Sequence, residues 1–248
     1  MDKQSEKKGE MGHLHPITTL IREISDIFSS LGFEIVQGNE IETEYYNFDI
    51  LNVPKDHPAR DMQDTFWVKG LKETVLRTQT SAEQGHYMED HEPPIKIAVP
   101  GKVFRREATD ATHEVQFHQF EGLVVDKDIT LAHLKWTLEL LLKKLFGENI
   151  KIKLRPGYFP FVEPGVEIDM ICFRCAGSGC PSCKQSGWIE ILGAGMVHPN
   201  VLNNIGIDPR EWRGFAFGIG IERLVMLKYG VDDVRTLYSG DLRLVNQF

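Results

Sequence analysis

Four cysteines with the spacing of metal ligands carry the most specific chemistry in this chain. Cys172, Cys175, Cys180 and Cys183 form two Cys-x-x-Cys pairs separated by four residues. Each pair can place two thiolates on one ion, and four deprotonated sulfurs suit tetrahedral Zn²⁺. An iron–sulfur cluster, or thiols without metal in a reducing cytosol, are the alternatives. Because protein ligands would fill all four positions, the pattern predicts a closed, structural zinc insertion at residues 172–183.

Two runs near the middle of the chain carry polar and aromatic residues at two-residue spacing. Arg105 and Glu107 lie in the first run, and Phe117, Gln119 and Glu121 lie in the second. Residues two apart share one face of an extended strand. The runs would therefore present an Arg/Glu pair beside a ring, an amide and a carboxylate, which predicts the floor of a binding site. A hairpin with a merely solvated polar face is the alternative.

A phosphate-binding pattern follows near the C-terminus. Gly218 and Gly220 end an apolar run, and Arg223 comes three residues later, where a helix is expected to begin. Backbone N–H groups, the positive end of a helix and a guanidinium would then converge on one point, which suits phosphate. Gly-x-Gly alone is weak evidence and could be a strand end.

Two phenylalanines lie in a segment interrupted by proline and glycine. Phe159 and Phe161 are two residues apart, so an extended backbone would aim both rings in the same direction. Two such rings are usually plain core. Beside a site for an aromatic ligand, they could recognise a ring edge-to-face.

Hydrophobic periodicity predicts the elements that hold these residues. Residues 16–31 form an apolar helical stripe that ends at Gly32, and residues 130–146 form a leucine-rich helix that ends at Gly147. The stripe of the first helix has more apolar surface than one chain can obviously cover, which favours association. Strands are expected over residues 33–36, 64–68, 95–99, 102–107, 115–125 and 150–155, with a turn at Pro100-Gly101. Residues 188–199 are expected to form a strand followed by a Gly-rich turn.

Composition limits the class of protein. The chain has 248 residues, 42% hydrophobic and 26% charged, which is ordinary for a globular protein with a buried core. We expect a disordered tail at residues 1–11, no membrane segment and no signal peptide, and hence a cytoplasmic protein. A net charge of −8 argues against broad non-specific nucleic-acid binding, though a local basic patch is compatible with it.

The two central runs also carry a resemblance. Residues 104–107 (Phe-Arg-Arg-Glu), a loop, and residues 117–122 (Phe-His-Gln-Phe-Glu-Gly) resemble motif 2 of the class II aminoacyl-tRNA synthetases. In detail they are similar to the α subunits of bacterial phenylalanyl-tRNA synthetases. Residues 214–224 resemble motif 3, and residues 12–49 resemble the motif 1 region. The similarity covers about residues 12–248, as one catalytic domain without the family's N-terminal coiled-coil arm.

The resemblance implies a fold and a reaction. The fold would be α+β, a mainly antiparallel sheet flanked by helices. The reaction would be ATP-dependent activation of L-phenylalanine to phenylalanyl-adenylate, followed by transfer to tRNA(Phe).

Residue roles for ATP come from the same resemblance. Arg105 would hold the α-phosphate and Arg223 the γ-phosphate, with Gly218 and Gly220 nearby. Phe117 would stack on adenine beside Glu107. Mg²⁺ would sit between phosphates and carboxylates, with Glu163 and Glu190 as the candidates.

Phenylalanine would occupy the other half of the site. Gln119 and Glu121 would take its ammonium, and Ala216 would close the far end of the ring pocket. Gln79 has a solvated turn as its alternative. The remaining expected contacts are Trp67, Ser81, Phe159 and Phe161.

Partners are implied as well. In this family the α chain works with a larger β chain, and we expect that complex in the cell and a homodimer when the chain is alone. One departure lies at Asn39, where the family usually has proline after Gly38. Since proline fixes φ and asparagine does not, this change affects the interface region.

A second class of function competes with the enzyme. A repurposed or non-catalytic synthetase paralog could be a binding module, or a ligase for an acceptor other than tRNA. The missing arm motivates this alternative, whereas the presence of every motif residue named above favours catalysis.

Overall fold

The computed structural model describes residues 12–60 and 65–248, so the predicted tail lies outside the described residues. The helices are α1 (Pro16–Ser30), α2 (Ser81–Asp90), α3 (Leu131–Phe146), α4 (Pro199–Asn204), α5 (Ile221–Tyr229) and α6 (Leu242–Val245). The strands are β1 (Glu34–Ile35), β2 (Ile41–Thr43), β3 (Thr74–Leu76), β4 (Ile95–Phe104), β5 (Gln116–Asp126), β6 (Ile152–Pro156), β7 (Val162–Ile171), β8 (Trp188–Val197) and β9 (Arg213–Gly220).

One sheet organises the chain. Seven strands pair in the order β1-β4-β5-β9-β8-β7-β6, and β2 pairs with β3 in a separate small sheet. The β1–β4 pair is parallel, and every other pair in the large sheet is antiparallel. The predicted class, a mainly antiparallel sheet flanked by helices, is confirmed.

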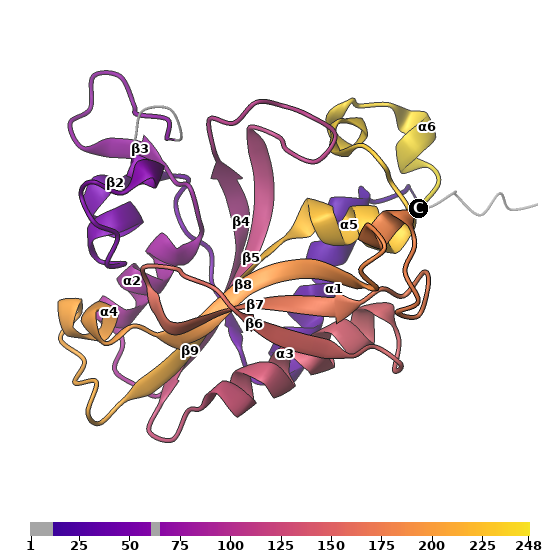
Figure 1. The fold of residues 1–248 in the computed structure, drawn as a ribbon. Helices are drawn as coiled ribbons and strands as arrows, with labels where there is room; N and C mark the ends of the chain where they lie inside the picture. The colour runs from indigo at the N-terminus through magenta and orange to yellow at the C-terminus, as the bar shows by residue number, and fades with distance from the viewer. Residues whose placement is uncertain (1–11, 61–64) are drawn as a thin grey trace, which may run out of the picture.

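The two faces of this sheet differ. Helices α1, α3 and α5 cover one face and bury the larger core cluster, with Phe28 and Phe120 among its fully buried side chains. On the other face α2 and α4 cover a second, smaller core cluster that includes Ile97 and Leu123, and further side chains of β5 and β9 line a cavity between these helices. The small β2–β3 sheet lies on the same side of the large sheet (Figure 1). Alternation along β5 separates the faces, since Phe120 lies in the core and Gln119 and Glu121 do not.

The α1 helix begins as predicted at Pro16. His15 accepts a hydrogen bond from the Ile17 N–H at 3.2 Å and caps the helix. Ile17, Leu20, Ile24 and Phe28 are buried in the chain's own core, and the rest of the stripe packs against that core. The expectation that this helix leaves a large apolar surface uncovered was wrong, because the sheet and helices α3 and α5 cover it.

Residues 95–104 form one strand, so the predicted turn at Pro100-Gly101 was also wrong. Strand β1 pairs only with Ile97 and Ala98, which leaves that edge of β4 open at Pro100, where a missing N–H costs nothing. A Cβ at Gly101 would overlap the Arg77 guanidinium, whose Nε donates to the Lys102 carbonyl at 2.7 Å. Pro100 therefore suits the open edge of β4, and Gly101 leaves room for the Arg77 guanidinium.

Residues 64–68 were predicted as a strand. Residue 64 lies outside the described residues, and in the rest only Trp67 pairs, in an isolated bridge to Val75. In the described part of the chain, no helix is long and apolar enough to cross a membrane.

Candidate active site

A cavity of about 490 Å³ opens between α2 and α4 on the face of the sheet that α1, α3 and α5 do not cover. Its floor includes Gln119 and Glu121 from β5 and Ala216 and Gly218 from β9. These strands are adjacent, and their register pairs Glu121 with Gly218. Lacking a side chain, Gly218 leaves the Glu121 carboxylate room, since a Cβ there would approach the glutamate to 3.2 Å.

Glu121 is the buried acid of this cavity. Only 4% of it is exposed, and its Oε2 accepts hydrogen bonds from Ser81 Oγ at 2.5 Å and Gln84 Nε2 at 2.9 Å. Burial raises the pKa of Glu121 to about 7, although the Ser81 hydroxyl opposes the rise. Gln119 lies two residues away, and its Oε1 is buried without a hydrogen-bond partner among the described residues. The Glu121 carboxylate and the Gln119 amide oxygen are therefore placed to accept hydrogen bonds from a cationic ligand.

Aromatic rings form the opposite wall. The ring centroids of Phe159 and Phe161 are 6.1 Å apart with 25° between their planes, and both rings line the cavity. A Cβ at Gly193 would lie 2.7 Å from the Phe159 ring, so glycine on β8 lets that ring lie against the strand. An apolar wall facing a buried acid suits a ligand with an ammonium at one end and a ring at the other.

A second cavity, of about 920 Å³, adjoins the first. Its lining includes Phe117, Glu190, Gly220 and Arg223. Arg223 Nε donates to the Glu190 backbone carbonyl at 2.8 Å, which fixes the guanidinium against the start of β8. A β-bulge lies beside this point, since Ile168 pairs with Leu192 but Asp169 pairs with Glu190.

Arg105 and Glu107 line both cavities and mark their junction. Arg105 Nε donates to the Thr78 carbonyl at 3.2 Å, and its guanidinium lies over the Phe117 ring, 5.1 Å from the centroid. These two contacts orient the Arg105 guanidinium at the junction of the two cavities. The first cavity suits a ligand with an ammonium and a ring, and the second contains Arg223. Such an arrangement can hold an anion that bridges two ligands.

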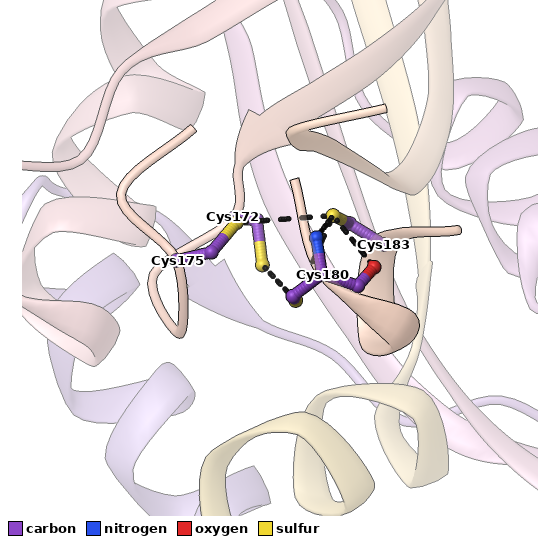
Figure 2. A group of neighbouring side chains, drawn as sticks. All are labelled: Cys172, Cys175, Cys180 and Cys183. Carbon is purple, nitrogen blue, oxygen red and sulfur yellow. Dashed lines mark hydrogen bonds between the residues drawn. The ribbon is translucent and has the colours of Figure 1, made fainter. Parts of the chain in front are cut away.

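The four cysteines gather between β7 and β8. Figure 2 shows their side chains pointing toward one another, with sulfur–sulfur distances of 3.7 Å (Cys172–Cys180), 3.8 Å (Cys175–Cys183) and 3.7 Å (Cys180–Cys183). A metal bonded to four sulfurs at about 2.3 Å separates them by about 3.8 Å. Burial opposes ionisation of Cys183, but hydrogen bonds from the Cys180 and Gly187 N–H groups lower its pKa to about 6. The cluster therefore fits one four-coordinate metal ion.

Comparison with known proteins decides the family. The profile of the family described as tRNA synthetases class II core domain (F) matches residues 2–248. This chain belongs to that family.

Named relatives of this synthetase are phenylalanine–tRNA ligase alpha subunits. The one from Bacillus subtilis (strain 168) is 58% identical over 240 residues, 96% of this chain and 69% of that protein. That of Lactiplantibacillus plantarum is also 58% identical, over 96% of this chain and 68% of its own length. Clostridium perfringens (strain ATCC 13124) has one that is 57% identical, over 98% and 71% respectively.

A solved structure shares the fold of the synthetase. Pyrrolysyl-tRNA synthetase from Desulfitobacterium hafniense superposes with a TM-score of 0.69 at 16% identity, covering 91% of this chain and 74% of that one. This likeness concerns the fold alone.

Two expected site residues lie elsewhere in the synthetase. Trp67 does not line either cavity, because its bridge to Val75 draws it toward the small β2–β3 sheet. Glu163 cannot share an ion with Glu190. Register pairs Val162 with Val197 and Asp169 with Glu190, so the two glutamates lie about 20 Å apart along the strands. Glu163 lines a separate surface pocket with Trp212.

The other expected contacts do line the cavities. Gln79 and Ser81 lie in the first cavity with Phe159, Phe161 and Ala216, and Gly220 lies in the second. Gln79 Nε2 donates one of its two hydrogens to the Asn47 carbonyl at 3.3 Å, so its other hydrogen and its Oε1 can meet a ligand.

Sequence reasoning missed two groups of residues. Gln84 contacts Glu121 from α2, one turn beyond Ser81, and helical spacing from Ser81 was the available signal. Glu222 is buried and accepts hydrogen bonds from the His118 N–H at 2.9 Å and the Tyr238 hydroxyl at 2.5 Å. This network ties β5 to α5 beside Arg223. No sequence signal joined His118 to Tyr238, since 120 residues separate them.

Proposed function

We propose that this chain activates L-phenylalanine with ATP and donates the phenylalanyl group to tRNA(Phe). The observation that carries the proposal is the position of Arg105, which lines an amine-and-ring pocket and an arginine-bearing cavity at once. A cation at that junction suits the α-phosphate, the atom group where amino acid and nucleotide must meet. The relatives' names support phenylalanine as the amino acid.

Phenylalanine fits the first cavity by charge and shape. Its ammonium would lie between the Glu121 carboxylate, which already accepts from Ser81, and the Gln119 amide oxygen, which has no hydrogen-bond partner among the described residues. Its ring would lie against Phe159 and Phe161 and end at Ala216. The carboxylate of the amino acid would then point toward Arg105.

Activation joins the two ligands. A carboxylate oxygen of phenylalanine attacks the α-phosphorus of ATP, and the bond from that phosphorus to the bridging oxygen breaks, so pyrophosphate leaves with the electron pair. The reaction needs positioning and charge neutralisation more than a general base. Arg105 would stabilise the α-phosphoryl charge and Arg223 the terminal phosphate, while Phe117 stacks on adenine near Glu107.

Transfer completes the cycle. A ribose hydroxyl at the 3′ end of tRNA(Phe) attacks the carbonyl carbon of the adenylate, and AMP leaves. Since the relatives are named alpha subunits, we propose that this chain acts with a larger β chain, in the cytoplasm where tRNA is charged.

Two metals belong to the proposal. Zn²⁺ would bind Cys172, Cys175, Cys180 and Cys183, whose spacing matches tetrahedral sulfur coordination. An iron–sulfur cluster would place several atoms between sulfurs that here lie within 4.8 Å of one another, which disfavours it. Mg²⁺ would neutralise phosphate charge, with Glu190 as the remaining carboxylate candidate in the second cavity.

The alternative, a repurposed or non-catalytic paralog, is not favoured. The arginines, the buried acid and the aromatic wall that the reaction needs all line the two adjoining cavities.

Amino-acid-dependent exchange of labelled pyrophosphate into ATP tests the proposal. We expect exchange with phenylalanine and Mg²⁺ present, exchange at least about tenfold weaker with tyrosine, and only background with aliphatic amino acids. Equal exchange with an aliphatic amino acid would contradict the substrate, and no exchange with any would contradict the activity.

A further inference from the structure

The cysteine loop, residues 172–187, does more than close a hairpin. It connects the end of β7 to the start of β8, and Cys183, Lys184 and Ser186 line the second cavity together with Arg223. A purely structural metal site could lie anywhere on the surface. This one forms part of the wall of the cavity that we assign to ATP.

Lys184 follows directly after the last cysteine. Its backbone is left-handed, with φ 49° and ψ 42°, and its N–H donates to the Pro181 carbonyl at 3.1 Å, so the turn around Cys180 and Cys183 fixes where this lysine leaves the loop. In the described part of the chain its ammonium forms no hydrogen bond or ion pair. The nearby Glu190 carboxylate accepts from Arg155 instead, at 3.2 Å. An unpaired ammonium on the wall of a cavity that holds Arg223 suits an anion.

The loop also bears on Arg223. Gly187 joins the loop to itself, since its N–H donates to Cys183 Sγ at 3.3 Å and its carbonyl accepts from the Cys172 N–H at 2.9 Å. Three residues later comes Glu190, whose carbonyl holds Arg223 Nε at 2.8 Å. The folded cysteine loop therefore determines where β8 begins. Because the Glu190 carbonyl in β8 accepts from Arg223 Nε, the loop also determines the position of Arg223.

We propose that the cysteine loop is a metal-dependent part of the nucleotide site, in which Lys184 binds the pyrophosphate end of ATP beside Arg223. The inference rests on the proposed function, because it takes the second cavity as the ATP site. A metal bound by the thiolates would hold Lys184 and the start of β8 in place, and its ligands do not line the first cavity. Metal occupancy then controls affinity for ATP, while the first cavity, which the loop does not line, keeps its affinity for phenylalanine.

Lys184→Met tests the lysine, because methionine keeps an unbranched chain and removes the charge. Calorimetric titration of the protein, purified in the assembly it forms in its cell, measures binding of Mg·ATP, inorganic pyrophosphate, AMP and phenylalanine. We expect ATP and pyrophosphate to bind about five- to tenfold more weakly, the scale of one charge-assisted contact, while AMP and phenylalanine bind as before. Arg174→Met is the matched control. It removes a charge from an exposed side chain of the same loop that lies by Gly230 and does not line the cavity.

Metal removal tests the dependence on the loop. Chelation followed by metal analysis should weaken ATP binding at least as much as Lys184→Met, with phenylalanine binding unchanged. Lys184→Met leaves the four thiolates intact, so its result stands even if the demetallated chain unfolds. Unchanged pyrophosphate affinity in Lys184→Met, or an equal loss in Arg174→Met, would overturn the inference. Absence of phenylalanine-dependent exchange in the unmodified protein would instead overturn the proposed function.

Discussion

Glu121 unites burial, hydrogen bonding and charge in a single side chain. Ser81 and Gln84 hold one oxygen of its carboxylate, and burial keeps its pKa near 7 until a cation arrives. The same residue could be picked out from sequence, because its two-residue spacing from Gln119 on a strand needs no tertiary information. The hydrogen bonds from Ser81 and Gln84 could not be predicted, because only the tertiary fold brings α2 next to β5.

Phenylalanine affinity should therefore depend on pH. Burial raises the folded-state pKa of Glu121 above its ordinary value of 4.5, so the carboxyl is neutral below about pH 7 and ionised above it. Only the ionised form attracts the ammonium. We expect the dissociation constant for phenylalanine to rise by up to about tenfold per pH unit below pH 7. Calorimetry between pH 5.5 and 7.5 measures it, and in Glu121→Gln binding should be weak and independent of pH. A flat profile in the unmodified protein would refute the role of this acid.

Selectivity should depend on Ala216. Its methyl group lies at the cavity, and an apolar end offers no partner for a tyrosine hydroxyl, so tyrosine should be rejected about ten- to a hundredfold. Ala216→Gly should admit para-chlorophenylalanine with little change for phenylalanine. Exchange measured with the three amino acids checks this, and an unaltered substrate range would disprove the pocket assignment.

The neighbouring residue supplies the control. Phe217 points to the opposite face, where its ring lies 5.4 Å from that of Phe28 and a Cβ at Gly122 would overlap it. Phe217→Ala should cost about 3–5 kcal/mol of folding stability without widening the choice of substrate.

The sequence predicted secondary-structure elements well where a local residue pattern determines the structure. The α1 and α3 helices, the second central strand and the cysteine pairs follow periodicity or spacing. The wrong predictions concern positions whose structure depends on which strands pair with one another. Pro100-Gly101 has the composition of a turn, yet it lies inside β4 because one edge of that strand is open. Glu163 and Glu190 were both predicted as candidates for Mg²⁺, yet the antiparallel register of β7 and β8 places them about 20 Å apart.

Loss of one cysteine should destabilise the element that it anchors. We expect one zinc per chain, retained through dialysis. In Cys180→Ser the metal should be lost with at least about 3 kcal/mol of stability, or about 6–12 °C in melting temperature for a chain of this size. Ser178→Ala removes only an exposed hydrogen bond of the same loop, from Ser178 Oγ to the Cys175 carbonyl at 2.7 Å, and should leave the metal bound. Thermal melting with metal analysis checks the result, and iron in the purified protein, or a metal-free native chain, would contradict it.

The whole molecule is built on one sheet, with helices covering one face and with α2 and α4 covering part of the other, where a cavity can take ligands. The helix that looked like an uncovered surface is covered by its own sheet, so the case for a homodimer now depends on other exposed apolar residues. Ile41 is 53% exposed and Tyr45 is 43% exposed, and both lie in the region that resembles motif 1.

We expect the exposed surface around Ile41 and Tyr45 to mediate association with other chains. We expect the chain to form a complex with a β chain when the two are produced together, and a homodimer when it is alone at micromolar concentration. Ile41→Lys should weaken both, whereas Leu242→Lys, at an exposed leucine of α6, should weaken neither. Sedimentation velocity measures the states. Only monomer under every condition would show that this face is not an interface.

The most direct measurement is the rate of phenylalanine-dependent exchange of pyrophosphate into ATP in the protein and in two variants. Arg105→Ala and Arg223→Ala should each lose about 2–4 kcal/mol of transition-state stabilisation, roughly a 30- to 1000-fold fall in rate, while remaining folded. That result would agree with a site in which one arginine joins the two cavities and another holds the terminal phosphate. Exchange at the unmodified rate in both variants, or exchange that does not require phenylalanine, would contradict it.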